Sequence, residues 1–211
     1  HKIKSPLSAI RGAAELLQEP LPEPERQRFL CNIQRETQRI QDLVDRLLEL
    51  AALETRHRLE AVELLDLRDL AREAVLATQP LAQAHQVTLV LAQGESAQVE
   101  GKAFLLQRAI ANLIENAVDF SPPGGRVDVA LLTDPQRAGV RITDQGPGIP
   151  DYAKARIFEK FFSLARPHSH KKGTGLGLAF VREVASLHRG QVSVANAEGG
   201  GAVATLSLPR G

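Results

Sequence analysis

Two stripes of hydrophobic positions, separated by a proline-rich break, mark the first quarter of the chain. Apolar residues recur every three or four positions from Ile3 to Leu17, which is the spacing of one face of a helix. The stripe stops at the segment EPLPEPE, whose three prolines interrupt a helix. A second stripe predicts an amphipathic helix over about residues 24–53, through Phe29, Ile33, Ile40, Leu43, Leu47 and Leu50. The pattern therefore predicts an antiparallel helical hairpin.

A hairpin of two helices cannot bury both of its hydrophobic stripes by itself. We therefore expect a homodimer in which two hairpins form a four-helix bundle. The second stripe predicts about 30 helical residues and the first only about 18, which leaves roughly 15 Å of the second helix without a partner. We expect the first helix to continue upstream of His1 in the parent protein, so that this domain is truncated at its N-terminus.

From about residue 56 the pattern changes to helices and strands in mixed order. Helical periodicity predicts helices over residues 67–85, 102–120 and 176–187. Alternating or β-branched runs predict strands near residues 87–92, 98–100, 126–132, 140–144, 191–197 and 202–208. The fold class is therefore α+β: the helical hairpin in residues 1–56, then an α/β sandwich in residues 57–211. We expect the sandwich to contain one mixed, largely antiparallel sheet with helices on one face.

Composition excludes several classes of protein. The chain has 211 residues, of which 43% are hydrophobic, enough for a core in each domain. Its net charge of +1 provides no basic surface, so no nucleic-acid partner is expected. No apolar run approaches the roughly 20 residues of a membrane helix, and we expect no membrane segment in this chain. The single cysteine, Cys31, cannot form an internal disulfide and receives no role.

Candidate chemistry begins on the predicted helix over residues 102–120. Asn112 and Asn116 are four positions apart, which places both side-chain amides on one helix face. Amide oxygens are hard, neutral ligands that suit a magnesium ion bridging phosphates. Phe120 follows one turn after Asn116 and could lay its ring against a purine. Two asparagines on a helix are also common as polar surface or cap residues, so this feature does not decide the function alone.

Three further motifs follow in order. DQGPGI, at residues 144–149, places a carboxylate at the end of an apolar strand, just before a glycine turn. IFEKFF, at residues 157–162, is an aromatic block. KKGTGLGL, at residues 171–178, is a glycine-rich loop that opens a helix, where backbone N–H groups and the helix dipole favour phosphate. Glycine turns are common singly. The order and spacing of all four motifs together are a more specific signal than any one of them.

Together these four motifs resemble the N, G1, F and G2 boxes of sensor histidine kinases, whose ATP-binding domain has the GHKL (Bergerat) sandwich fold. The resemblance covers nearly the whole chain and implies ATP and Mg²⁺ as cofactors, with Asn116 as the metal ligand. It implies that Asp144 accepts a hydrogen bond from the adenine amino group and that Lys160 reaches the γ-phosphate. Asp119 stands where many members have a phosphate-binding lysine. The expected nucleotide-binding residues are Asn112, Asn116, Phe120, Asp144, Gly146, Gly148, Ile149, Lys160, Gly173, Thr174, Gly175, Leu176 and Gly177.

The first residues, HKIKSPL, resemble the H-box of the same family, and this segment looks most like the CreC type of sensor kinase. His1 is then the phosphoacceptor and the catalytic nucleophile, because an imidazole with a pKa near 6.5 is mostly neutral at cellular pH. Lys2 stands where members usually carry Glu or Asp, and a lysine cannot accept a hydrogen bond from the histidine. Ser5 replaces the more usual Thr or Asn, so kinase and phosphatase rates are both open.

The resemblance implies autophosphorylation on His1 from ATP, followed by phosphotransfer to an aspartate of a response regulator. It also implies that the chain is the cytoplasmic portion of an inner-membrane sensor protein. A catalytically weak, nucleotide-binding dimeric adaptor or a phosphatase-biased sensor domain remains the alternative, because of Lys2. ATP-hydrolysing relatives of the fold carry a glutamate four residues before the metal-binding asparagine. Asn112 holds that position here and lacks the basicity to activate water, so hydrolysis is disfavoured.

Overall fold

The computed structural model describes residues 3–56, 58–167 and 173–211. His1 and Lys2, the expected phosphoacceptor and its neighbour, lie outside the described residues. The chain divides into two compact units, His1–Ala52 and Leu53–Gly211. The domain boundary expected at residue 56 marks the change of sequence pattern and stays a prediction. Among the described helices, none combines the length and the apolar character needed to cross a bilayer.

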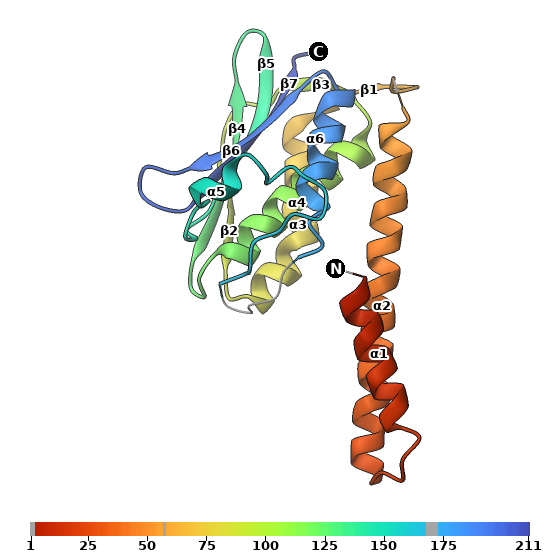
Figure 1. Ribbon diagram of the computed structural model, residues 1–211. Helices are drawn as coiled ribbons and strands as arrows, with labels where there is room; N and C mark the ends of the chain where they lie inside the picture. The colour runs from red at the N-terminus through yellow and green to blue at the C-terminus, as the bar shows by residue number, and fades with distance from the viewer. Residues whose placement is uncertain (1–2, 57, 168–172) are drawn as a thin grey trace. The chain divides into compact units, whose positions relative to one another are not determined.

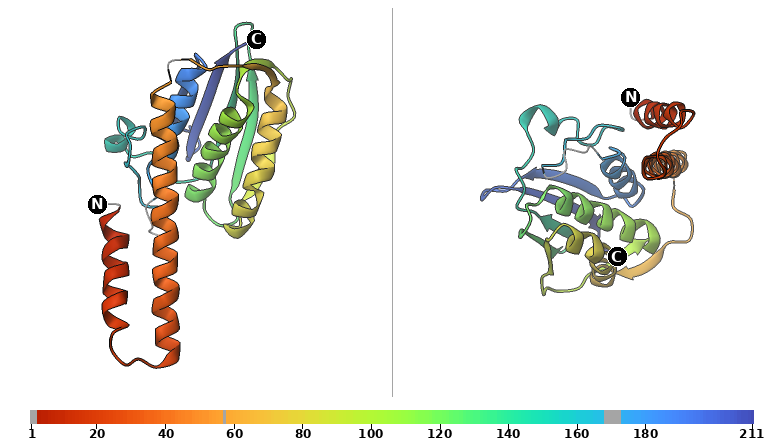
Figure 2. Two further views of the ribbon diagram at one scale, coloured as in Figure 1. Left: turned by 90° about the vertical axis from the view of Figure 1, so that its right-hand side faces the viewer. Right: turned by 90° about the horizontal axis from the view of Figure 1, so that it is seen from below.

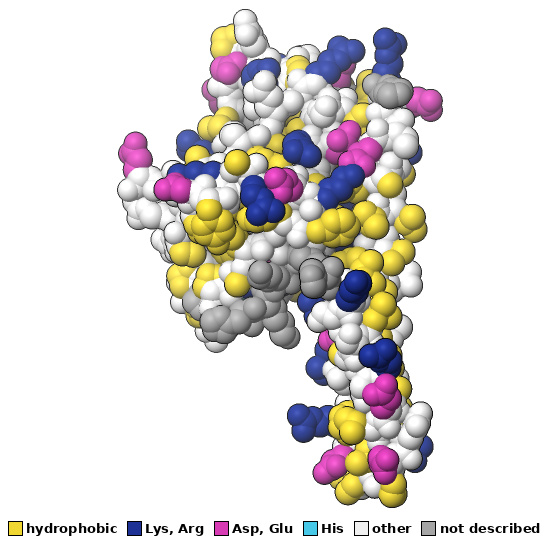
Figure 3. Space-filling view, in the orientation of Figure 1, with side chains coloured by type: hydrophobic (Ala, Val, Ile, Leu, Met, Phe, Trp, Pro, Cys, Tyr) yellow, Lys and Arg dark blue, Asp and Glu magenta, His cyan; other side chains and the backbone are white. Residues whose placement is uncertain are grey.

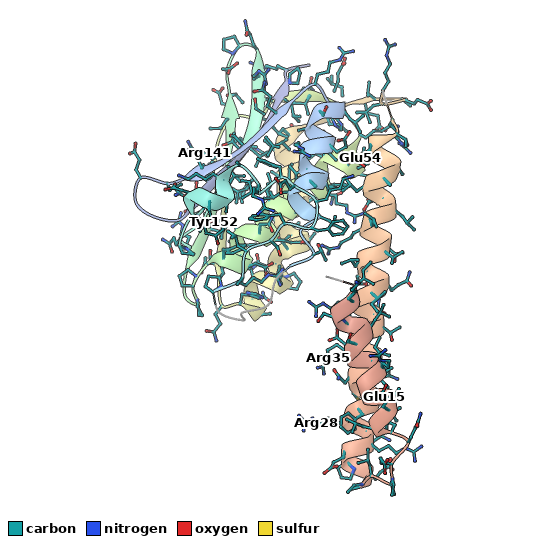
Figure 4. All side chains as sticks on the ribbon, viewed as in Figure 1. Glu15, Arg28, Arg35, Glu54, Arg141 and Tyr152 are labelled. Atoms are coloured by element: carbon teal, nitrogen blue, oxygen red, sulfur yellow. The ribbon has the colours of Figure 1, made fainter. Side chains whose placement is uncertain are left out.

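The first unit is the helical hairpin. Helix α1 (Lys4–Leu16) runs beside the first part of α2 (Glu23–Glu54), with the proline-rich break between them (Figures 1 and 2). Glu23 and Glu25 lie in the first turn of α2, where negative charge complements the helix dipole. Charged side chains cover part of the surface, among them the exposed Glu15, Arg28 and Arg35 (Figure 4). The helix-period pattern is thus confirmed for both helices.

Large hydrophobic side chains also remain exposed along the hairpin, where Figure 3 shows them among the charged groups. They are Ile3, Leu7, Leu16, Leu30 and Leu48, the last 63% exposed. Ala13 and Leu43 are buried within the same single chain. One hairpin therefore buries only part of its two stripes.

The second unit contains a mixed five-stranded sheet in the order β2-β4-β5-β7-β6. Among the described strands, only β2 (Thr88–Leu91) and β4 (Arg126–Thr133) pair in parallel. Antiparallel pairs join β4 to β5 (Arg137–Thr143), β5 to β7 (Ala202–Pro209), and β7 to β6 (Gln191–Asn196). The expected mixed, largely antiparallel sheet is confirmed. A separate two-stranded sheet pairs β1 (Glu63–Asp66) with β3 (Gln98–Gly101), so the single sheet expected from the sequence is corrected to two.

Three helices cover one face of the large sheet, as the right-hand view of Figure 2 shows: α3 (Leu67–Ala84), α4 (Ala103–Phe120) and α6 (Gly177–Leu187). Asp66 caps α3, because its Oδ1 accepts a hydrogen bond from the N–H of Arg68 at 2.8 Å. A one-turn helix, α5 (Asp151–Lys154), follows the glycine turn after β5.

Helix α4 is central because its apolar face is fully buried. Leu106, Ile110 and Ile114 have no exposed surface, nor do Val127 and Val129 of β4. Each such side chain contributes about 1.5–3 kcal/mol through burial. The helix ends at Phe120, two residues before Pro122, which cannot continue a helix. This anchoring fixes the opposite, polar face of α4, on which the candidate site is built.

Candidate functional site

The polar face of α4 lies against the start of α6. Asn112 and Asn116 are both half-buried, and Nδ2 of Asn112 donates to the carbonyl oxygen of Arg108 at 3.0 Å. A methyl group added at Gly177 would lie 3.1 Å from Oδ1 of Asn112 and 3.9 Å from Nδ2 of Asn116. The two amides therefore share one face of α4, and the end of the glycine-rich loop approaches both of them closely.

The start of α6 presents backbone donors beside these amides. Leu176 is the N-cap residue, and no side chain among the described residues caps the helix. The N–H of Leu176 itself makes only a long bond, 3.4 Å, to Oγ1 of Thr174. The first-turn N–H groups of α6 thus have no side-chain cap, and the helix dipole adds partial positive charge there. Such a helix start is suited to binding a phosphate group.

The glycine-rich loop and the aromatic block interlock. The N–H of Phe161 donates to the carbonyl oxygen of Gly175 at 2.8 Å, and a methyl group at Gly175 would lie only 2.5 Å from the carbonyl oxygen of Phe162. Gly175 has φ 72°, which a glycine adopts readily. Phe161 also has a positive φ, 65°, and such strain in a non-glycine residue is typical of functional segments.

The other aromatic residues of the block anchor it. Phe158 and Phe162 pack against the buried cluster of Ile149, Ala153 and Ile157. Lys160, expected to reach a phosphate, is paired with Glu54, whose Oε2 lies 2.7 Å from its Nζ. The last two residues of α2, Leu53 and Glu54, fall in the second unit, so this ion pair lies within that unit. The role expected for Lys160 stays a prediction.

Asp144 is buried at the end of β5, with 8% of its surface exposed. Its Oδ1 accepts hydrogen bonds from the N–H groups of Gly146 at 2.8 Å and Ala202 at 3.0 Å. Burial nevertheless raises the pKa of the Asp144 carboxyl above its ordinary value, because desolvation outweighs the two backbone donors. The described hydrogen bonds of this side chain all use Oδ1, so Oδ2 remains as an acceptor for a ligand.

The glycine turn after Asp144 is packed tightly on three sides. A methyl group at Gly146 would lie 2.7 Å from the carbonyl oxygen of Phe120, so the turn sits against the end of α4. Gly148 has φ 76° and lies against the side chain of Asn196. Gly201, with φ 87°, passes so close to the backbone of Asp144 that no side chain would fit. Glycine is required at these positions because neighbouring segments approach too closely to leave room for a side chain.

Sequence reasoning missed two residues that shape this turn. Asn196, at the end of β6, binds both backbone polar groups of Ile149: Oδ1 accepts from its N–H at 2.6 Å, and Nδ2 donates to its carbonyl at 3.1 Å. Asn196 carries no motif, so nothing local could have indicated this contact. Gly201 ends a run of three glycines, which was a usable signal of a tight turn.

Two family models match the chain. The model of the His Kinase A (phospho-acceptor) domain matches residues 1–56. The model described as histidine kinase-, DNA gyrase B-, and HSP90-like ATPase matches residues 101–211. The second match contains all of the motifs assembled above around α4, the Asp144 turn and the glycine-rich loop.

Known proteins that are similar to this chain in sequence or structure include sensor kinases. Sensor protein CreC of Escherichia coli (strain K12) is 43% identical over 212 residues, covering 100% of this chain and 44% of CreC. The solved structure of the mycobacterial sensor histidine kinase MprB is 34% identical, with a TM-score of 0.60, and covers 71% of this chain and 98% of that chain. Full-length ShkA, crystallised in complex with AMPPNP, is 25% identical, with a TM-score of 0.73, and covers 98% of this chain and 43% of that chain.

This chain thus spans less than half the length of CreC and ShkA and nearly all of the MprB chain. The four boxes expected from the sequence meet in one sandwich, and the matched models cover the hairpin and the sandwich in the expected order. On these grounds the chain belongs to the sensor histidine kinases, and within that family it is CreC-like.

Proposed function

We propose that this chain binds Mg-ATP between α4 and α6, transfers the γ-phosphate to His1, and then passes it to an aspartate of a response regulator. The proposal rests on one observation. The side-chain amides of Asn112 and Asn116 lie close to Gly177, at the start of α6, and no described side chain caps that helix start. One element offers a metal ligand and the other offers anion-binding donors, which a metal–triphosphate complex needs together. The relative ShkA was crystallised in complex with AMPPNP, which supports nucleotide binding by this fold.

Magnesium would be held by Asn116 together with phosphate oxygens. The described residues contain no group of three His, Cys, Asp or Glu side chains that could hold a metal ion. A site with one amide ligand, phosphate oxygens and waters suits Mg²⁺, which gives up its waters reluctantly. When bound, the ion neutralises the charge that develops on the phosphates during transfer.

Adenine would be bound through Asp144. Its Oδ1 accepts hydrogen bonds from two backbone N–H groups, which fixes the carboxylate and leaves Oδ2 outside the described hydrogen bonds. A carboxylate with one oxygen fixed can accept the exocyclic amino hydrogen of adenine with little loss of side-chain entropy. Phe120 and the turn through Gly146 and Gly148 would flank the base.

The transfer itself requires positioning more than covalent help from the protein. The imidazole lone pair of His1 would attack the γ-phosphorus, the bond to the bridging oxygen of ADP would break, and the imidazole proton would pass to solvent. Lys2 cannot take that proton, and a slow reaction is the expected consequence. The catalytically weak adaptor and the phosphatase-biased domain therefore remain the second candidate, on the grounds of Lys2 and Ser5.

Two partners follow from the proposal. A second copy of the chain would cover the exposed Leu7, Leu30 and Leu48 of the hairpin and complete a four-helix bundle. A response regulator would supply the acceptor aspartate. We also propose that the parent protein is a membrane-anchored sensor of which this chain is the cytoplasmic portion.

The proposal is tested by incubating the chain with Mg²⁺ and ATP labelled in the γ-position. The label is expected to become attached to the protein and to be released by acid but not by base, as is typical of a phosphorylated histidine. A protein that binds ATP yet takes up no label would support the adaptor. Label that resists acid would place the phosphate on a hydroxyl side chain instead.

A further inference from the structure

A buried carboxylate lies beside the proposed phosphate site. Asp119 is in the last turn of α4, one turn after Asn116, and only 7% of its surface is exposed. A negative charge held there, out of water, would repel a triphosphate unless a cation balances it. The side chains around Asp119 therefore decide whether this end of α4 can accept a nucleotide.

The balancing cation comes from the segment between the aromatic block and the glycine-rich loop. Arg166 forms an ion pair with Asp119 through its Nη2 and the Oδ2 of the carboxylate. On the other side, Nε2 of His85 lies 3.9 Å from Oδ1 of Asp119. Asp119 thus joins α4 to Arg166 and to His85, the C-cap residue that follows α3.

Arg166 also lies against the first glycine of the loop. A methyl group added at Gly173 would be 3.4 Å from Nη2 of Arg166. The carbonyl oxygen of Gly173 accepts a hydrogen bond from Oγ of Ser163 at 3.2 Å, so this short segment is bonded to the loop through Ser163 and lies close to it at Arg166. The guanidinium is therefore placed between the end of α4 and the start of the phosphate-binding loop.

We propose that Arg166 binds the phosphate chain of the nucleotide and that Asp119 is the residue that positions it. An arginine has five donors in a rigid planar fork, so its guanidinium can pair with Asp119 and still donate to a phosphate. The side chain of Arg166 is 33% exposed, which leaves part of the group accessible to a ligand. Asp119 then contributes to phosphate binding through the cation it holds.

The opposing interpretation gives the ion pair only a structural role, closing residues 163–167 onto α4. The two interpretations differ in which part of the nucleotide is affected. A phosphate ligand discriminates ADP from adenosine, because adenosine has no phosphate. A purely structural pair changes the binding of both ligands alike or of neither.

The experiment measures the binding of Mg-ADP to the full chain by calorimetry, and that of adenosine by competition against it. Arg166→Gln is expected to lower ADP affinity about 10- to 100-fold, the loss of one charged hydrogen bond, and to leave adenosine affinity within about twofold. Arg166→Lys is expected to be intermediate, since a lysine keeps the positive charge but lacks the planar fork of donors of the guanidinium. Asp119→Asn is expected to lower ADP affinity by a smaller factor than Arg166→Gln.

Arg182→Gln is the matched control, because it removes one positive charge from an exposed position on α6. The double variant Asp119→Asn/Arg166→Gln keeps two hydrogen-bonding amides in contact, so it tests the charges even if a single variant folds poorly. In the double variant the ratio of ADP to adenosine affinity is expected to fall as in Arg166→Gln.

Unchanged ADP affinity in Arg166→Gln, or an equal loss for ADP and adenosine, would overturn the assignment of Arg166. The inference rests on the proposed nucleotide site, and the two fail differently. A wild-type chain that binds neither ADP nor adenosine would refute the proposed function itself and the role of Arg166 with it.

Discussion

Asn196 binds Ile149 as a strand neighbour would, although it uses its side chain to do so. Its amide accepts from the backbone N–H of Ile149 at 2.6 Å and donates to the backbone carbonyl at 3.1 Å. This contact joins the end of β6 to the glycine turn that follows Asp144. The shape of the proposed adenine site therefore depends on a residue outside all four sequence motifs.

Replacing Asn196 by alanine is expected to lower both the stability of the chain and its affinity for ATP. Two hydrogen bonds to partly buried backbone groups are lost, at about 1 kcal/mol each, and the Gly148–Ile149 turn loses its support. Calorimetry would measure ATP affinity, and thermal unfolding followed by circular dichroism would measure stability. Gln191→Ala, an exposed position on the same strand, is the control and should change neither. Equal behaviour of the two variants would show that the contact does not shape the site.

Asp144→Asn is expected to weaken ATP binding while making the ligand-free chain more stable at neutral pH. Asparagine keeps an oxygen for the N–H groups of Gly146 and Ala202, but it turns a donor toward the adenine amino group. Loss of a charged hydrogen bond corresponds to about 10- to 100-fold in affinity. ATP affinity would be measured by calorimetry and stability by thermal unfolding, on the same samples.

The sign of the stability change follows from the pKa of Asp144, which burial raises in the folded state. Below its ordinary value of 3.8 the carboxyl is protonated in both states, and its contribution to stability is lost as pH rises through the folded pKa. The stabilisation of Asp144→Asn should therefore shrink as pH is lowered towards 4. A variant that is less stable than the wild type at pH 7 would contradict this account.

His188 makes the stability of the second unit depend on pH in the opposite sense. Its Nε2 accepts from the N–H of Lys102 at 3.1 Å, and its Nδ1 lies 2.7 Å from the carbonyl oxygen of Val184, so the ring is neutral with its proton on Nδ1. Burial lowers the pKa of His188 below 6.5. The folded state thus binds fewer protons than the unfolded state between these two pKa values, and stability rises with pH across that window.

Lowering the pH from 7 towards 5 is accordingly expected to reduce the free energy of unfolding, by at most about 1.4 kcal/mol per pH unit from this one group. In His188→Gln that slope should be smaller. His1→Gln also removes one histidine and should keep the slope of the wild type. Denaturant unfolding at several pH values would measure all three proteins, and identical slopes would exclude His188 as the cause.

Lys2→Glu is expected to raise the rate of autophosphorylation. A carboxylate beside the phosphoacceptor can orient the imidazole and take its proton, and general-base catalysis contributes roughly 10²- to 10⁴-fold, which sets the upper limit of the gain. The initial rate of label uptake from γ-labelled ATP is the measurement. Lys4→Glu makes the same change of charge at an exposed position of α1 and should have little effect. A Lys2→Glu chain that binds ATP but stays inactive would favour the adaptor.

Long periodic segments could be read from the sequence, whereas contacts between distant segments could not. The helical periodicity of residues 102–120 predicted α4 to within one residue at its start, because burial of one face imposes helical spacing over many residues. The four-residue strand β1 and the one-turn helix α5 were missed, since such short segments carry no period.

The candidate site divides in the same way. Asn112, Asn116 and the glycine-rich loop could be named because their residue types and spacing follow from phosphate chemistry. The partners of Asp119 and Ile149 come from distant parts of the chain, and only the fold brings Arg166 and Asn196 to them. Polar side chains that position other groups have no local signature, so sequence reasoning passes over them.

The most direct test of the central claim, that His1 takes phosphate from ATP bound beside Asn116, compares two variants in one experiment. Label uptake from γ-labelled ATP and ATP affinity would be measured for the wild type, His1→Gln and Asn116→Ala. We predict that His1→Gln abolishes uptake and keeps the affinity of the wild type, whereas Asn116→Ala loses uptake and Mg-ATP binding together. Label that persists in His1→Gln, or undiminished Mg-ATP binding in Asn116→Ala, would contradict the account.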